Sequence, residues 1–296
     1  MTERQPPIVM TDRGPEPHRP VHVERWTPDG RLTDDDIVAA EEPLQVVLDG
    51  EPFAVVMRTP GHDLELVLGL LFVEGLIRHR QDVADGAVAA SGLPEHVAPF
   101  PLRVLPEAEN LVELRLVRPR AKDDRVGWQR NLVASSACGI CGAAALDALR
   151  DDLPPLPPGP TFSAAAITGM APALRAAQAT FELTGGLHAA GLFDIEGRLL
   201  HLREDVGRHN AVDKLVGRAM LAGELPLHDR ALMLSGRASF ELAHKAVAAG
   251  IPLMAAVSAP SSLAAHVAHT FGLTLVGFLR GERFNIYAGG ERIGHG

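Results

Sequence analysis

The sequence contains few cysteines. Only two occur among its 296 residues, and they lie three positions apart as Cys138 and Cys141. A closed structural zinc site needs four ligands, so a zinc site in this chain would need His, Asp or Glu in addition. The closest histidine pair, His266 and His269, is spaced more tightly than in the usual zinc-finger pattern. The scarcity of cysteine excludes an all-cysteine zinc site and leaves a mixed site unsupported.

The sequence also lacks long hydrophobic runs. The longest apolar stretch, residues 66–73, lies between Glu65 and Glu74 and is too short to cross a bilayer. Residues 1–20 are charged and proline-rich, without the apolar region of a secretory signal. We therefore expect a cytoplasmic protein with no membrane partner. In that compartment a close cysteine pair is more often catalytic or metal-binding than a structural disulfide.

Positive charge is in deficit as well. The formal net charge is -9 and the pI is about 5.8, which argues against general binding to nucleic acid or to a membrane surface. Local basic pockets remain compatible with this balance. With 46% hydrophobic residues the chain can bury a sizeable core, and its length suits one large or two modest domains.

The cysteine pair precedes a helix-forming run. Its sequence is Ser-Ala-Cys-Gly-Ile-Cys-Gly, followed by residues 143–150. A cysteine at a helix start faces unpaired backbone N–H groups and the positive end of the helix dipole, which lower the thiol pKa below about 8.5. The flanking glycines make two buried structural thiols less favoured. We therefore interpret the pair as reactive.

Four chemistries use Cys-x-x-Cys at a helix start: zinc binding, thioredoxin-like exchange, zinc-dependent deamination and sulfur carriage. Thioredoxin-like motifs follow the first strand of a small domain, whereas this motif lies in mid-chain. A deaminase needs His-x-Glu and then Pro-Cys-x-x-Cys, but His22-Val23-Glu24 lies far upstream and Ala137 replaces the proline. Sulfur carriage needs a thiolate that accepts sulfur as a persulfide. The pair alone does not select among metal binding, exchange and carriage.

Turn residues organise the first half of the chain. Asp49-Gly50 separates two β-rich runs, 44–48 and 52–58, and predicts a hairpin. Thr59-Pro60-Gly61 then turns the chain into a predicted helix over 62–78. We further expect a loop over 94–100, a strand over 111–117, a charged connection over 118–130 and a proline-rich linker over 151–160.

The second half alternates strands with helices. The predicted strands cover 231–234, 252–257 and 273–278, and the predicted helices cover 239–249 and 262–271. This rhythm predicts a largely parallel sheet covered on both faces. We divide the chain into a disordered leader (1–25), an N-terminal α+β subdomain (26–125) and a C-terminal α/β domain (126–296) that carries the cysteine loop.

Small, hydroxylated and basic residues follow the predicted strands. They form the segments Ser235–Arg237, Ser258–Ser262, Arg280–Arg283 and, after a fourth predicted strand at 199–202, Arg203–Asn210. Ligands bind outside the carboxyl ends of such strands, and arginines, hydroxyls and helix N-terminal amides suit phosphate or pyrophosphate. Taken alone, each arginine is as readily a solvated surface charge. His209, Asp213 and Lys214 on the following predicted helix either orient a ligand or pair within the helix.

Longer motifs carry a family resemblance. They are Glu42–Leu44, Met57–Leu66, the segment around the cysteines, Arg203–Lys214, Ser235–Glu241, Val257–Ser262, Gly277–Arg280 and Arg283–Tyr287. Together they resemble the FdhD family, the formate dehydrogenase accessory sulfurtransferases, over about residues 40–290. The leader and the proline-rich linker lie outside the resemblance.

The resemblance implies a sulfur carrier. Such a protein takes persulfide sulfur from a cysteine desulfurase and transfers it to the molybdenum or tungsten bis-guanine-dinucleotide cofactor before the cofactor enters formate dehydrogenase. The persulfide maps to Cys138, with Cys141 assisting. Cofactor binding maps to Phe278, Leu279, Arg280, Gly281, Glu282 and Arg283, to which the strand-end pattern adds Arg208, His209, Arg237 and Ser258.

The resemblance also implies a fold. It is a three-layer α/β domain similar to cytidine deaminases, with a mixed, largely parallel sheet, plus the smaller N-terminal subdomain. The bound substrate is then the molybdenum bis(molybdopterin guanine dinucleotide) cofactor, with GDP or GMP as analogue and no structural metal. Expected partners are a cysteine desulfurase, formate dehydrogenase and a second copy in a homodimer, but no nucleic acid. The alternatives are a chaperone that binds the cofactor without carrying sulfur, and a structural metal site.

Overall fold

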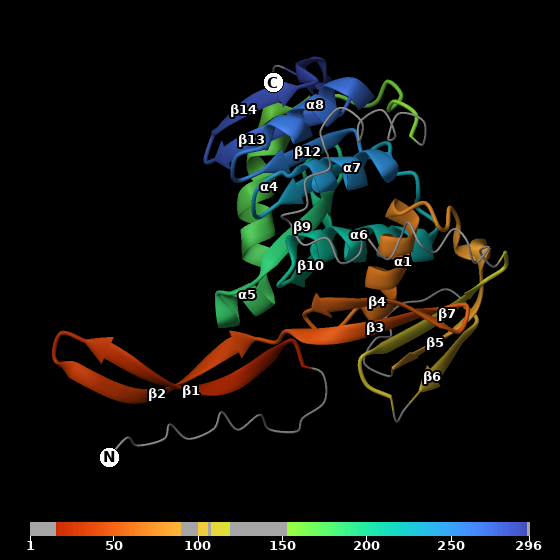
Figure 1. Ribbon diagram of the computed structural model, residues 1–296. Helices are drawn as coiled ribbons and strands as arrows, with labels where there is room; N and C mark the ends of the chain where they lie inside the picture. Colours follow the sequence, from red (N-terminus) through yellow and green to blue (C-terminus); the bar gives the residue numbers. More distant parts are fainter. Residues whose placement is uncertain (1–15, 90–99, 106–107, 119–152, 295–296) are drawn as a thin grey trace.

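A computed structural model describes residues 16–89, 100–105, 108–118 and 153–294 (Figure 1). These residues form a six-stranded sheet of order β10-β9-β11-β12-β13-β14 and a five-stranded sheet of order β4-β3-β7-β5-β6. Two small two-stranded sheets accompany them. The cysteine motif and the predicted division at residue 125 lie outside the described residues.

The six-stranded sheet is mixed. Its strands are β9 (His188–Phe193), β10 (Leu199–Asp205), β11 (Ala231–Leu234), β12 (Leu253–Ala256), β13 (Thr274–Arg280) and β14 (Arg283–Ala288). Only β11 with β12 and β12 with β13 pair in parallel, whereas the other three pairings are antiparallel. The predicted mixed sheet is confirmed, and the three strands that the alternation predicted do pair in parallel, but the sheet as a whole is not largely parallel. Short turns join β9 to β10 and β13 to β14, and such turns permit only antiparallel neighbours, while the parallel strands have helical crossovers.

Helices cover both faces of this sheet. On one face lie α6 (Arg208–Ala222), α7 (Phe240–Ala248) and α8 (Ser262–Phe271), and on the other lie α4 (Ala164–Ala177) and the short α5 (Ala179–Thr184). Alternate residues of one strand supply the two cores: Leu232 packs on the α6 side and Met233 on the α4 side. The three-layer α/β architecture is confirmed, and the closer likeness to cytidine deaminases stays a prediction.

The five-stranded sheet is built around the predicted hairpin. Its strands are β3 (Glu42–Leu48), β4 (Glu51–Arg58), β5 (Val83–Ala89), β6 (Leu102–Leu105) and β7 (Leu111–Leu116), with α1 (Asp63–Val73) and the 3-10 turn η1 (Arg80–Asp82). Asp49 and Gly50 have the positive φ angles, 54° and 80°, that this turn requires. Helix α1 begins where predicted but ends five residues earlier than residue 78, because Gly75 turns the chain at a φ of 71°.

Residues 18–39 form an arm. Strands β1 (His18–Thr27) and β2 (Gly30–Ala39) pair antiparallel over their whole length and project as a twisted ribbon that continues into β3 (Figure 1). The prediction of disorder through residue 25 is therefore wrong for residues 18–25. Charged side chains obscured the strand pattern, but they pair across the ribbon, as Arg25 does with Asp34 at 3.1 Å.

The C-terminal end of the chain packs back on the start of α4. Strands β8 (Phe162–Ser163) and β15 (Ile293–Gly294) pair in parallel, and the 3-10 turn η4 (Gly290–Arg292) precedes β15. Arg292 donates to the carbonyls of Gly272 and Pro157, at 2.5 Å and 3.0 Å. These contacts fix the described part of the proline-rich segment, which has no helix or strand, as predicted.

A close crossing of α1 and α6 joins the two larger sheets. The two helices touch at glycines: a Cβ at Gly69 would lie 1.9 Å from the carbonyl oxygen of Asp213, and one at Gly217 would lie 1.8 Å from that of Glu65. Leu66 and Val216 are buried in the same core. The absence of two side chains therefore sets how near the two helices lie.

We predict that Gly69→Ala and Gly217→Ala each destabilise the fold. Overpacking typically costs about 1–3 kcal/mol, and an added methyl group would meet backbone that cannot rotate away. Gly169→Ala is the matched control, because a Cβ there has no atom within 4 Å, and alanine in an exposed helix gains about 0.5–1 kcal/mol. Urea unfolding measures the three changes. Equal stability of all three variants would contradict the close crossing.

Candidate functional site

Four strands end at one edge of the six-stranded sheet. Strand β10 is antiparallel to β9, and β9 is antiparallel to β11, so β10 points the same way as β11, β12 and β13. The loops leaving these strands are tied together: Ala238 N donates to Ala259 O at 3.3 Å, and Phe278 N donates to Ser258 O at 3.2 Å. The structure thus brings together the four segments that the sequence singled out.

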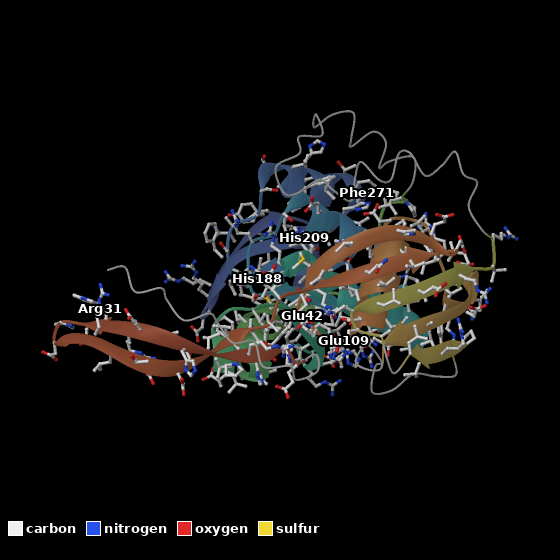
Figure 2. The ribbon with its side chains drawn as sticks, turned by 60° about the horizontal axis from the view of Figure 1, so that its bottom comes forward. Arg31, Glu42, Glu109, His188, His209 and Phe271 are labelled. Atoms are coloured by element: carbon white, nitrogen blue, oxygen red, sulfur yellow. The ribbon has the colours of Figure 1, made fainter. Side chains whose placement is uncertain are left out.

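Arginine and histidine side chains gather at this edge. We call His188, Arg208, His209, Arg237 and Arg280 the strand-end cluster. Figure 2 shows His188 and His209 near one another in the middle of the view, and the charge of His209 acts on His188. Burial lowers the pKa of His188, and the charges of Arg208, His209 and Arg237 lower it further. The cluster is therefore a region of positive potential in an acidic chain.

The arginines of the cluster have few protein partners. Arg208, Arg237 and the neighbouring Arg283 form no hydrogen bond or ion pair with another described residue, and the Nε of Arg208 is nevertheless buried. Arg280 donates only to the carbonyl of Val257, at 3.4 Å. Arg208 is half-buried, whereas Arg237, Arg280 and Arg283 are exposed. Guanidinium groups without carboxylate partners are suited to an external anion, because they bind phosphate with paired hydrogen bonds.

His209 has a carboxylate partner. Its Nε2 lies 2.7 Å from Glu241 Oε2 and 3.2 Å from Ser239 Oγ at the start of α7. The hydrogen bond with His209 holds the pKa of Glu241 below its usual value. His209 is only partly exposed, so the pair fixes the ring at the rim of the cluster.

Asp213 and Lys214 turn away from the cluster. Asp213 pairs with Lys245 at 2.6 Å, and Lys214 pairs with Asp205 at 2.7 Å, all in buried positions. Lys214 also donates to the carbonyl of Thr59 at 2.9 Å. The structure thus shows these two residues paired with residues of other elements, which is neither of the two roles that the sequence left open.

The segment 278–283 has an unusual backbone. Phe278 adopts a left-handed conformation with φ of 53°, although it is exposed and aromatic, and the β13–β14 register shifts between Gly277 and Arg280. A non-glycine residue in this region is strained, and such strain concentrates at functional sites. Leu279 is 1% exposed and belongs to the core on the α4 side, so within this segment it serves packing.

A cavity of about 510 Å³ adjoins the cluster on the α4 side of the sheet. His188 and Ser235 line it together with Arg175, Gln178, Phe181 and Val257. The Arg175 guanidinium lies over the Phe181 ring, 4.7 Å from its centroid. The sequence did not predict this cavity or His188, because His188 begins an antiparallel strand that the β-α-β rhythm did not include.

The segment around His62 supports the cluster from the other sheet. His62 itself is left-handed, with φ of 60°, and its Nδ1 is buried without a hydrogen bond, 3.5 Å from Glu65 Oε2. Arg203 binds both oxygens of that carboxylate, at 2.6 and 2.7 Å. Burial, and then the charges of Arg203 and Lys214, lower the pKa of His62 to about 3. Residues 57–66 and 203–214, both prominent in the sequence, thus pack on each other.

The part of the chain that the structure describes contains neither a group of metal ligands nor a membrane-spanning helix. No group of three or more His, Cys, Asp or Glu side chains there is placed to hold a metal ion. No helix among those residues is long and apolar enough to span a membrane. The two cysteines, Cys138 and Cys141, fall outside this part, so their predicted roles stay predictions.

Comparison with known proteins assigns the family. The model of the FdhD/NarQ family matches residues 39–294, which is most of the chain. The chain belongs to this family. Sulfur carrier protein FdhD of Streptomyces avermitilis is 48% identical over 265 residues, covering 87% of this chain and 89% of that protein. Sulfur carrier protein FdhD of Nocardia farcinica is 45% identical over 273 residues, covering 92% and 93%.

A solved structure shares the fold of this family member. It is the crystal structure of a proposed formate dehydrogenase accessory protein from Desulfotalea psychrophila, with a TM-score of 0.69 and 24% sequence identity. The likeness covers 94% of this chain and all of that one. The predicted family is confirmed, and the shared fold includes both larger sheets, because the match extends over nearly the whole chain.

We predict that His62 makes stability depend on pH. Because its pKa is about 3 in the folded chain and 6.5 otherwise, only the unfolded chain binds a proton between these values. Its contribution is fully present above pH 6.5 and is lost as the pH falls toward 3. His62→Asn, which tolerates the left-handed backbone, should show a smaller loss of unfolding free energy on acidification. Exposed His266→Gln is the control, and identical pH profiles for both variants would contradict this assignment.

Proposed function

We propose that the chain is a sulfur carrier required by formate dehydrogenase. Its curated relatives carry the name sulfur carrier protein, and the protein of the shared fold is described as a formate dehydrogenase accessory protein. The observation that carries the proposal is family membership over residues 39–294, which includes a Cys-x-x-Cys pair that is otherwise unexplained. Transfer takes place in the cytoplasm, with a cysteine desulfurase as sulfur donor.

In this proposal Cys138 carries the sulfur. Its thiolate attacks the outer sulfur of the persulfide on the desulfurase, forms a Cys138 persulfide and releases the desulfurase cysteine as a thiolate. The exchange conserves electrons, because one sulfur–sulfur bond breaks as another forms. For release, the Cys141 thiolate attacks the inner sulfur of Cys138 and expels hydrosulfide, leaving a disulfide. A cellular dithiol must then reduce this disulfide before the next cycle.

The proposed substrate binds at the strand-end cluster. The molybdenum bis-guanine-dinucleotide cofactor is large and carries two pyrophosphates, which suit arginines that lack protein partners, Arg208 with its orphaned Nε above all. Phe278 and the chain from Arg280 to Arg283 lie at the rim, and the adjoining 510 Å³ cavity offers room for a ring system beside His188 and Ser235. GDP and GMP are the matching small probes.

The second candidate is a chaperone that binds the cofactor without carrying sulfur. The strand-end cluster favours it as much as it favours a carrier, because both need an anion site. The cysteine pair separates the two, since a chaperone has no use for a reactive thiol. A homodimer is proposed for either function.

We predict that Cys138→Ala abolishes sulfur acceptance. After incubation with a cysteine desulfurase and cysteine, wild-type protein should gain one sulfur atom on Cys138, removable by reductant, as read by intact-protein and peptide mass spectrometry. Cys141→Ala is the matched control, because it removes the other thiol and should retain the persulfide. Sulfur gained by Cys138→Ala would reject Cys138 as the carrying residue. No sulfur gained by wild type or by either variant, while GDP still binds, would reject the carrier and favour the chaperone.

We predict that Arg208→Ala and Arg237→Ala each weaken GDP binding by roughly 10- to 100-fold, because each loses one charge-assisted contact of about 1.5–3 kcal/mol. Isothermal titration calorimetry measures the affinity. Arg103→Ala is the control, because Arg103 is an exposed arginine on β6 of the other sheet and should leave the affinity unchanged. Affinities that are the same in all three variants would place the nucleotide elsewhere.

A further inference from the structure

The cavity beside the strand-end cluster has mostly apolar walls. They are formed by side chains of α4, of α5 and of the segments next to β9 and β12, namely Leu174, Phe181, Leu187 and Val257. Its volume, about 510 Å³, lies in the range of small-molecule sites, roughly 300–1,000 Å³. Such sites take flat apolar groups and orient them through a few polar contacts, so the polar side chains of this cavity decide which ring it suits.

One buried polar side chain of this cavity lacks a partner. Gln178 joins the end of α4 to the start of α5, lines the cavity and is only 4% exposed. Its carboxamide forms no hydrogen bond with another described residue, although buried amides are normally hydrogen-bonded. An oxygen acceptor and two N–H donors are therefore available to a molecule that enters the cavity.

Glu204 on β10 holds the chain that carries Gln178. Its two carboxylate oxygens accept from the backbone N–H groups of Thr180 and Phe181, at 3.0 Å and 2.7 Å. These two residues follow Gln178 directly after Ala179, so the junction between α4 and α5 is fixed to the sheet. The carboxamide is thus held in place before any ligand arrives, which is what a selective contact needs.

We propose that Gln178 binds the polar edge of a planar heteroaromatic ring that enters this cavity. The ring belongs to the class that has a hydrogen-bond donor and an acceptor side by side on one edge, because a carboxamide matches such an edge with two hydrogen bonds. Guanine and pterin both have this edge, and the proposed substrate contains both rings. The inference rests on the proposed function and adds to it the residue that selects the ring, while the strand-end cluster binds the phosphates.

A thermodynamic cycle tests this contact. Gln178→Met keeps the length of the side chain and removes its polar end, and the 5′-diphosphate of purine riboside has the bicyclic ring of GDP without its oxygen and amino group. By isothermal titration calorimetry, Q178M should bind GDP roughly tenfold more weakly than wild type, because two neutral hydrogen bonds are lost. Its affinities for the purine riboside diphosphate and for pyrophosphate should be unchanged. Gln45→Met, at an exposed position on β3 of the other sheet, is the matched control.

Titration of 6-hydroxymethylpterin with the same proteins distinguishes the two rings, since Gln178 binds the ring of whichever probe, GDP or the pterin, loses affinity in Q178M. The proposal is overturned if neither probe loses affinity, or if GDP, the purine riboside diphosphate and pyrophosphate all bind more weakly to the same extent. Pyrophosphate separates this inference from the proposed substrate site. A wild-type chain that binds neither pyrophosphate nor GDP contradicts that site, whereas binding of both with no effect of Q178M on either ring contradicts only the role of Gln178.

Discussion

The buried pair of Asp205 and Lys214 joins the two larger sheets, and the position of the candidate site depends on it. Lys214 donates to the carbonyl of Thr59, while Asp205 accepts from the backbone N–H of Thr59 at 3.2 Å. Asp205 also accepts from Gly207 N and Asn210, so the same carboxylate shapes the start of α6. Breaking a buried pair typically costs about 3–5 kcal/mol, because one charge is left without a counterion. The first turn of α6, which presents Arg208 and His209, is thus fixed by contacts that cross from one sheet to the other.

The same pairing explains how an acidic chain has a positive edge. Where α1 and α6 connect the two larger sheets, three carboxylates form ion pairs within the protein. Asp63 binds Arg58, Glu65 binds Arg203, and Asp213 binds Lys245. The side chains of the strand-end cluster have little negative charge near them, apart from Glu241 beside His209. The net charge of -9 is therefore a property of the whole chain, whereas the charge at this edge of the sheet is positive.

The sequence predicted the parts of the fold that local rules determine. The structure contains the hairpin at Asp49-Gly50, the helix over 262–271 and the parallel strands β11 and β12. These elements were predictable because turn residues and apolar periodicity are signals that span only a few neighbouring residues. It did not predict the arm, whose strands pair through charge across the ribbon, or the antiparallel β9 and its His188. Buried charges were missed for a related reason: Lys214 looks like a surface residue until Asp205 and Thr59, distant in sequence, are placed beside it. The strand-end segments that the sequence singled out do lie together, while the ligand roles of their residues stay predictions. The Leu279 side chain is 1% exposed and packs in the core.

The orphaned Nε of Arg208 bears on how a substrate is held. A buried donor without an acceptor typically costs about 1–3 kcal/mol or more when charged, and the fold bears that cost in the absence of a ligand. An anion that reaches this nitrogen restores the missing hydrogen bond, and the first turn of α6 that carries Arg208 is already held, because Asp205 accepts from Gly207 N and from the Asn210 side chain. The strain at Phe278 belongs to the same argument, because its left-handed backbone holds an exposed ring at the rim in advance of binding. Both features lower the free energy of an anion-bound state relative to the free one, which suits the large anionic substrate proposed above.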